Sequence, residues 1–152
     1  MDNKEFKKLF GQLAKVSGFS IACGGCYRES SECLFTLYLQ KSSYSNYYYL
    51  LINICIQGYR GEKYLVNKDT VQGFLYTFAK EAPKEFNEVF RLDNCMEDSI
   101  RAQLLKSLFT DFLVPLSDKA LTIDGIKELI KSGVLIMLPH HKEELNRMGI
   151  DI

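Results

Sequence analysis

Two cysteines separated by two glycines, Cys23 and Cys26, are the most conspicuous candidates for chemistry in this sequence. A CxxC spacing can bring two sulfurs together as a redox disulfide or as half of a zinc site. A thioredoxin-type site needs its first cysteine at the start of a helix, where the dipole lowers the thiol pKa, but strand-like residues follow here. Zinc needs further ligands, and Cys33 is the one nearby candidate. We therefore expect free thiols in a strand made flexible by its two glycines, with no metal site and no cofactor.

Other patterns that could support catalysis have simpler explanations. His140 and His141 are adjacent, and neighbouring side chains on a helix point about 100° apart, which favours capping or exposure over shared binding of one ion. The acidic residues Asp93, Glu97 and Asp98 are typical of a first helical turn, where they complement the helix dipole. The sequence contains no Walker loop, dinucleotide glycine pattern or GxSxG elbow. We therefore predict no catalytic residues, which argues against an enzyme but leaves that class open.

Length and charge favour one ordinary folded domain over residues 1–152. The 152 residues are 47% hydrophobic and 25% charged, which suffices for an apolar core. Nineteen basic residues balance nineteen acidic ones, so no net charge attracts nucleic acid, and we expect no nucleic-acid partner. No window approaches the run of about 18 apolar residues of a membrane span, and no secretory signal begins the chain. Five cysteines, an odd number, fit a reduced compartment, so the expected location is cytoplasmic.

The spacing of apolar residues predicts the helices and strands in which these residues lie. Residues 4–16 repeat at helical spacing, and residues 19–27 alternate as a first strand bent at its glycine pair. Residues 28–32 form a turn, after which residues 33–40 and 47–57 alternate as two further strands. Short connections make these strands antiparallel. The strand over 47–57 is apolar on both faces, so we place it in the middle of the sheet.

The second half of the sequence is mostly helical in its spacing. It predicts helices from Val71 to Pro83, from Asn94 as N-cap to Pro115, from Thr122 to Gly133, and after Pro139. Residues 86–92 are ambiguous between a short strand and an ordered connection. The predicted fold class is α+β, with a mainly antiparallel sheet of three to five strands, packed helices and a helical C-terminal half.

One face of the predicted sheet carries polar and aromatic residues that we single out as a binding surface. From their positions in the strands we expect Arg28, Tyr38, Gln40, Tyr49 and Asn53 to share this face. The alternative is that a helix covers the face and satisfies its polar groups internally. A tyrosine cluster near basic residues could also stack on single-stranded nucleic acid, but strand propensity explains the tyrosines more simply.

Several segments resemble a known family across most of the chain. They are the FKKLF helix, Gly18-Phe19, Tyr27-Arg28, Leu39-Gln40-Lys41-Ser42, Tyr47 to Tyr49, Pro115, Leu129, Gly133 and Leu138-Pro139. The sequence resembles the bacterial domain-of-unknown-function family numbered 4304. This resemblance implies a small intracellular bacterial protein without an established activity, so it transfers no residue roles.

The leading functional hypothesis is a noncatalytic module that binds a protein partner. It rests on the missing catalytic signatures and on the surface around Tyr38, Gln40 and Tyr49, because tyrosine contributes well to interfaces. An immunity-type protein that neutralises a toxin is one specific form. The alternative is a small-molecule binding protein or an enzyme, which a concave pocket with convergent Arg28, Gln40 and Asn53 would favour. Neither hypothesis sets an oligomeric state.

Overall fold

A computed structural model covers residues 1–152 and has an antiparallel sheet of five strands, arranged in their order along the chain. The strands are β1 (Ser20–Ala22), β2 (Gly25–Glu29), β3 (Cys33–Lys41), β4 (Tyr48–Ile56) and β5 (Phe78–Lys80). The helices are α1 (Asn3–Val16), α2 (Lys68–Val71), α3 (Asp98–Ser107), α4 (Val114–Ala120), α5 (Ile123–Lys131) and α6 (Pro139–Arg147). The predicted α+β class with a helical C-terminal half is confirmed. None of these helices combines the length and apolar character needed to span a membrane.

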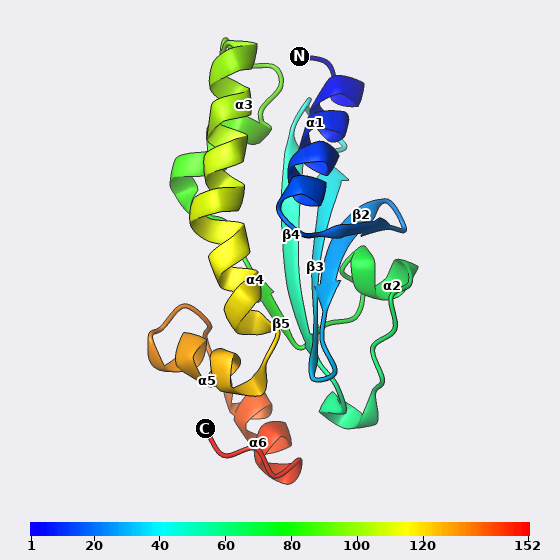
Figure 1. Ribbon diagram of the computed structural model, residues 1–152, viewed down its shortest axis with the longest axis vertical. Coiled ribbons are helices and arrows are strands. Elements are labelled where there is room, and N and C mark those ends of the chain that lie inside the picture. Colours follow the sequence, from blue (N-terminus) through cyan, green and yellow to red (C-terminus); the bar gives the residue numbers. More distant parts are fainter.

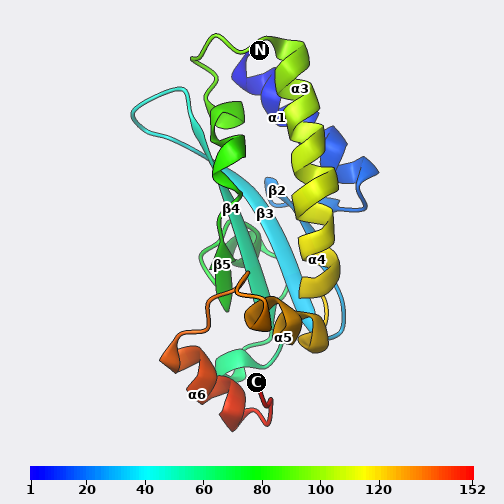
Figure 2. The same cartoon turned by 90° about the vertical axis from the view of Figure 1, so that its left-hand side faces the viewer.

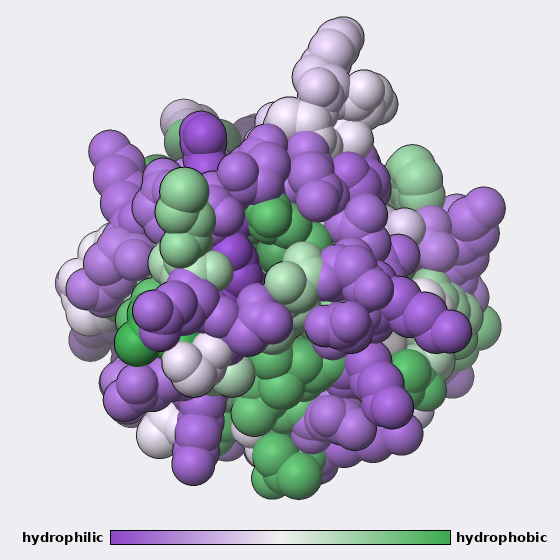
Figure 3. All heavy atoms as spheres, turned by 90° about the horizontal axis from the view of Figure 1, so that it is seen from above, coloured by the Kyte–Doolittle hydropathy of each residue, from purple (hydrophilic) through white to green (hydrophobic).

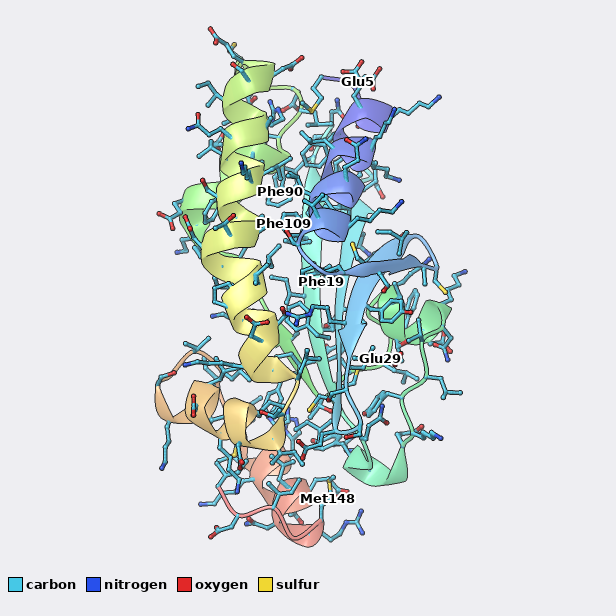
Figure 4. All side chains as sticks on the ribbon, viewed as in Figure 1. Glu5, Phe19, Glu29, Phe90, Phe109 and Met148 are labelled. Atoms are coloured by element: carbon cyan, nitrogen blue, oxygen red, sulfur yellow. The ribbon has the colours of Figure 1, made fainter.

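Helices cover the two faces of the sheet unequally. Helix α1 and the long helix formed by α3 and α4 lie over one face, which we call the helix face, and the short α2 lies over part of the other, which we call the second face (Figures 1 and 2). Phe19, Phe90 and Phe109 lie between the long helix and the sheet (Figure 4). The ring of Phe109 lies 5.0 Å from that of Phe10 and 6.0 Å from that of Phe19. Each such buried aromatic side chain stabilises the fold by about 1.5–3 kcal/mol.

The two longest strands form the framework of the sheet. Strand β4 pairs with β3 in an unbroken register from Cys33 opposite Ile56 to Lys41 opposite Tyr48. On its other edge it pairs with the short β5 at Ile52–Ile54 only. The expectation that this strand has a partner on each side is confirmed.

Seen from the end that carries the start of α1, the surface is mostly hydrophilic, with hydrophobic side chains exposed between the charged ones (Figure 3).

The predicted first strand is a hairpin of two strands. Ala22 pairs with Gly25, so Cys23 and Gly24 form a two-residue turn between β1 and β2. Both have positive φ, 52° and 80°, as a type I′ turn requires. The glycine pair therefore reverses the chain instead of bending it, and the predicted turn at residues 28–32 is shorter because β2 extends to Glu29.

The helix predicted from Val71 to Pro83 is wrong. Helix α2 ends at Val71, and Gly73 follows with a φ of 82°, a conformation that terminates helices. The chain then enters β5, because the backbone of residues 78–80 finds partners on β4. Residues 86–92 are an ordered connection and not a strand. They lie largely in the 3-10 helix η2 (Lys84–Phe90), which is followed by a single bridge between Arg91 and Tyr47.

Two predicted helix boundaries are also wrong. Glu97, and not Asn94, occupies the N-cap position of α3. Pro115 does not end that helix, because a π-helical segment, Leu108–Leu113, carries the chain continuously from α3 into α4. A π turn changes the backbone hydrogen-bonding register, which accommodates a proline that has no N–H to donate. The predicted cap at Thr122 is confirmed, since its side chain accepts a 2.9 Å hydrogen bond from the Gly125 N–H.

Arg101 is a buried arginine that joins α3 to η2. Its side chain is 2% exposed. One guanidinium nitrogen donates to the carbonyls of Glu88 and Val89, and the other donates to Asn94 Oδ1 at 2.6 Å. Burial lowers the pKa of Arg101 from its ordinary value. The Glu88 carbonyl also accepts hydrogen bonds from the Arg91 N–H and from Asn94 Nδ2, so Arg101 matters most for the Val89 carbonyl.

His141 fixes α6 against β5. The Leu138 N–H donates to its Nδ1 at 3.1 Å, and its Nε2 lies 3.0 Å from the Thr77 carbonyl oxygen. Both contacts are satisfied when the ring is neutral with its proton on Nε2. Burial, followed by the neighbouring His140, lowers the pKa of His141. Protonation of Nδ1 would replace an acceptor by a donor facing the Leu138 N–H.

Replacing Arg101 is expected to destabilise the protein strongly. Arg101→Met keeps an unbranched side chain but leaves the Val89 carbonyl and Asn94 Oδ1 without their guanidinium donors, which should cost about 3 kcal/mol. Arg147→Met is the matched control, because Arg147 is exposed and its solvent-screened ion pair with Glu144 should contribute little to stability. Urea unfolding measures both. Equal losses of unfolding free energy would contradict the assigned role of Arg101.

Stability is expected to fall as the pH drops below about 6.5. Unfolded His141 binds a proton near its ordinary pKa, whereas the folded ring resists protonation, so the unfolded state binds more protons in this range. The unfolding free energy should decrease by up to about 1.4 kcal/mol per pH unit. Urea unfolding at pH 7.5 and 5.5 tests this. His141→Gln should remove most of the slope between these values, and His140→Gln should retain most of it; the reverse pattern would refute the assignment.

Candidate functional site

Four of the five residues predicted for the binding surface lie on the second face. Gln40 pairs with Tyr49, and Asn53 pairs with Thr36, two residues before Tyr38. Because alternate residues of a strand point to the same side, Tyr38, Gln40, Tyr49 and Asn53 share this face. The structure therefore brings these residues to one side of β3 and β4.

The predicted position of Arg28 on this face is wrong. Arg28 pairs with Phe35, which points to the helix face. Its Nη1 lies 2.6 Å from both Ser117 Oγ and Asp118 Oδ1 of α4, and its guanidinium lies over the Phe19 ring. The register of β2 determines which face of the sheet Arg28 points to, and this register depends on the position of the β1–β2 turn. Arg28 thus connects the sheet to α4.

The second face is covered over one half and open over the other. The Thr36 hydroxyl donates to the Thr70 carbonyl, and the Cys55 thiol donates to the Leu75 carbonyl. These bonds hold α2 and the segment after it over that part of the sheet. Further along the strands Tyr38 is half-buried, and Gln40 and Tyr49 are exposed. The sequence left two alternatives for the second face, a covered face and an exposed surface, and each holds for one half of this face.

A hollow of about 590 Å³ lies beside the covered half, along the edge of β4. We call it the β4 hollow. It is lined by Tyr47, Tyr49, Leu50, Leu51, Ile52, Asn53, Gly73, Tyr76, Ala79, Lys80, Glu81, Ala82, Lys84, Asn87 and Phe90. Strand β5 and η2, which together follow this edge of β4, contribute one wall (Figure 2). Of the predicted residues, Tyr49 and Asn53 line the hollow, whereas Tyr38 and Gln40 lie outside it.

Part of the β4 backbone faces this hollow without a partner. The Ser42 N–H donates to the Tyr47 carbonyl, which shows that odd-numbered residues of β4 direct their backbone groups to β3. The Thr77 N–H donates to the Ile54 carbonyl, so even-numbered residues direct theirs to the opposite edge. Leu50 is even-numbered, and no hydrogen bond joins its backbone to the segment that follows β5. Its N–H and C=O are therefore free at this edge.

Asn53 contributes a second unpartnered polar group. The residue is 3% exposed, yet no hydrogen bond within the chain engages its side-chain amide, unlike its neighbours Thr36 and Cys55. The amide lies against Gly73, where an added Cβ would be 2.7 Å from Asn53 Nδ2. Glycine at position 73 therefore leaves room for this amide at the hollow. The Asn53 amide is not among the fully buried side-chain atoms that lack a partner, so it stays accessible from the hollow, where it can donate to and accept from a ligand.

Charged and aromatic side chains complete the lining. Lys80, Glu81 and Lys84 contribute a net positive charge, and none of the three takes part in an ion pair. The rings of Tyr47 and Tyr49 meet edge to face with centroids 4.9 Å apart. Burial, followed by the nearby Tyr49, raises the pKa of Tyr47, so its hydroxyl is a neutral donor and acceptor.

A second hollow of about 490 Å³ adjoins the first between β5 and α6. Tyr76 and Ala79 line both hollows. Six of the eleven exposed large hydrophobic residues of the chain lie on or next to this pair of hollows. We call them the apolar rim: Tyr49, Phe74, Leu75, Tyr76, Ile136 and Leu138. Such clustering differs from the scattered exposure that is normal on a monomer surface.

The cysteines lie apart from these hollows. Cys23 is exposed in the β1–β2 turn and Cys26 is buried in β2, and all five thiols are free. Burial raises the pKa of Cys26, Cys33 and Cys55 to about 12, which keeps them protonated and unreactive at neutral pH. No three His, Cys, Asp or Glu side chains gather closely enough to hold a metal ion.

Comparison with known families decides the classification. Residues 10–119 match the family model described as Domain of unknown function (DUF4304). The chain belongs to this family. No curated protein and no solved structure matches the chain. The resemblance drawn from the sequence is thus confirmed, and every residue that lines the β4 hollow falls within the part matched to DUF4304, whereas α5 and α6 lie beyond it.

Sequence reasoning missed Tyr76, Lys80 and Lys84. These residues fell in or next to a segment predicted as helix, where their spacing gave no indication of a strand edge. The available signal in the sequence was the run of three consecutive hydrophobic residues, Phe74–Tyr76, directly after Gly73, because such a run does not fit the one-sided apolar stripe of an amphipathic helix.

Two thiols are expected to react rapidly with a disulfide reagent in the native protein. Cys23 and Cys95 are exposed, whereas burial and a raised pKa protect the other three. Titration with dithionitrobenzoate should give two fast thiols, and all five in denaturant. Cys23→Ser should lower the fast count by one, and Cys26→Ser should not change it. A third fast thiol in the native wild type would contradict the burial described.

Proposed function

We propose that this DUF4304 protein is a noncatalytic module that binds a protein partner through the apolar rim. The observation that carries the proposal is the gathering of six exposed large hydrophobic residues around two adjoining hollows. Interfaces are enriched in tyrosine and phenylalanine at their centres, and pockets beside such residues accept side chains from a partner. The predicted residue Tyr49 belongs to this surface, together with Tyr76 and Phe74.

The position of the rim supports recognition of a large partner. Tyr76 lies between the two hollows, and residues on either side extend the surface from β4 to the start of α6. An apolar rim needs an apolar counterpart, so the part of the partner that packs on the rim is apolar. An immunity-type protein is one form of such a module. The zero net charge of the chain gives no long-range attraction to a basic toxin, so apolar contact would have to supply the affinity.

A small-molecule binding protein or an enzyme is the second candidate, and the volume of the β4 hollow favours it. Ligand pockets commonly occupy about 300–1,000 Å³. Of the polar residues expected to converge there, Asn53 lines the hollow, but Arg28 and Gln40 do not. The hollow has no nucleophile paired with a base, so binding is better supported than catalysis. We further propose a cytoplasmic location, which the five free thiols support.

Tyr76→Ser is expected to weaken partner binding. Tagged wild-type protein captures the partner from native lysate, and the purified partner is then titrated calorimetrically against each variant. Loss of a central tyrosine should raise the Kd at least about tenfold. Tyr44→Ser is the matched control, because Tyr44 is 99% exposed in a loop outside the rim, and its Kd should stay within about twofold. Failure to capture a partner, or equal affinities for both variants, would refute the proposal.

A further inference from the structure

We propose that the β4 hollow binds the carboxyl-terminal end of a peptide chain, presented by the protein partner. This inference rests on the proposed function and specifies what the partner inserts. Four features of the hollow carry it: a free strand edge, closure at both ends, an unpartnered amide and two lysines without ion pairs.

The free strand edge calls for a peptide-like ligand. By the alternation along β4, the Leu50 N–H and C=O lie on the edge that borders the hollow, and no hydrogen bond joins them to residues 81–83 directly after β5. An extended chain presents a C=O and an N–H at matching spacing, so it can pair with one strand residue through two hydrogen bonds. The interruption between β5 and η2 therefore leaves a short edge that a partner chain can complete.

Closure at both ends requires that the partner chain terminate inside the hollow. At one end Ile52 pairs with Lys80, and at the other Tyr47 pairs with Arg91. A strand that ran along the whole edge would have to displace these pairs. A chain end has no such continuation, so it fits where a through-running strand does not.

The polar lining selects a carboxyl terminus over an amino terminus. Lys80 and Lys84 bring positive charge, and neither is neutralised by an ion pair. Glu81 offsets only one of these two charges. The Asn53 amide can donate to a carboxylate oxygen, which would give this 3% exposed group the partner it lacks within the chain. A terminal ammonium would instead face two like charges.

The remaining lining determines the preferred last side chain. Tyr49, Tyr76 and Phe90 line the same hollow. Aromatic rings such as these pack favourably against apolar or aromatic side chains. We therefore expect carboxyl termini that end in Phe, Leu or a similar residue to bind best.

Short peptides test the inference directly. Acetylated tetrapeptides with free carboxyl ends, covering all twenty last residues, are titrated by fluorescence anisotropy against the full chain, with amidated peptides as matched controls. Free acids ending in apolar or aromatic residues should bind, and amidation should weaken binding about tenfold because it removes the charge. N-methylation of the amide that faces Leu50 should weaken it similarly. Absence of binding by every free acid, or equal affinity of acid and amide, would overturn the inference.

Variants of the chain test the location. The double variant Lys80→Gln and Lys84→Gln should lower affinity for the free acid about tenfold and leave the amidated peptide unaffected. The matched control is Lys8→Gln with Lys15→Gln on α1, which covers the opposite face, and it should bind like the wild type. Asn53→Asp, which is nearly isosteric, should also weaken the free acid selectively. Equal effects of both lysine pairs would overturn the assigned site.

Failure of this inference can be told apart from failure of the proposed function. If Tyr76→Ser abolishes partner binding while no peptide binds and the Lys80/Lys84 variant captures the partner normally, the module stands and the chain-end site is refuted. If Tyr76→Ser leaves partner binding intact, the proposed function fails whatever the peptides do.

Discussion

The backbone of β4 needs a hydrogen-bonding partner on each of its two edges, and the rest of the structure follows from how it obtains them. Strand β3 satisfies one edge along its whole length. The other edge is satisfied at Ile52–Ile54 by β5, at the Ile56 N–H by the Thr77 hydroxyl, and again at the Asn46 carbonyl by the Leu92 N–H. A buried backbone group without a partner costs about 1–3 kcal/mol, so the stretch between these points has to stay open to water or to a ligand. The β4 hollow exists because this pairing is interrupted.

The helical C-terminal half holds the interrupted edge in place. Arg101 of α3 donates to the Val89 carbonyl at the end of η2, and η2 forms part of the wall of the β4 hollow. His141 of α6 binds the Thr77 carbonyl directly before β5 and lines the adjoining hollow. These two contacts attach the segments that flank the open edge of β4, η2 and β5, to helices α3 and α6. The helices thus determine the shape of the surface that we propose as the binding site.

Three features of the structure support our proposal that this surface binds a partner. The hydrophobic residues of the apolar rim are exposed to solvent, so they do not stabilise the folded monomer by burial. The three cysteines with a pKa of about 12 lie in the sheet as inert apolar side chains. The polar groups without partners, the Leu50 backbone and the Asn53 amide, are donors and acceptors suited to recognition. Their chemistry matches that of a peptide group.

The long helices and strands could be predicted from the order of residues, because periodicity over many residues reflects one buried face. The sequence predicted α1, β3, β4 and the N-cap of α5 at Thr122, and it predicted that Tyr49 and Asn53 share a face. It could not place Arg28, since strand parity has meaning only once a register is set by a turn such as Cys23-Gly24. Nor could it identify β5, whose three residues become a strand only through hydrogen bonds to β4. The hollow was decided by tertiary structure alone, because it arises where two segments distant in sequence fail to pair, and an absent contact leaves no local pattern in the residues that line it.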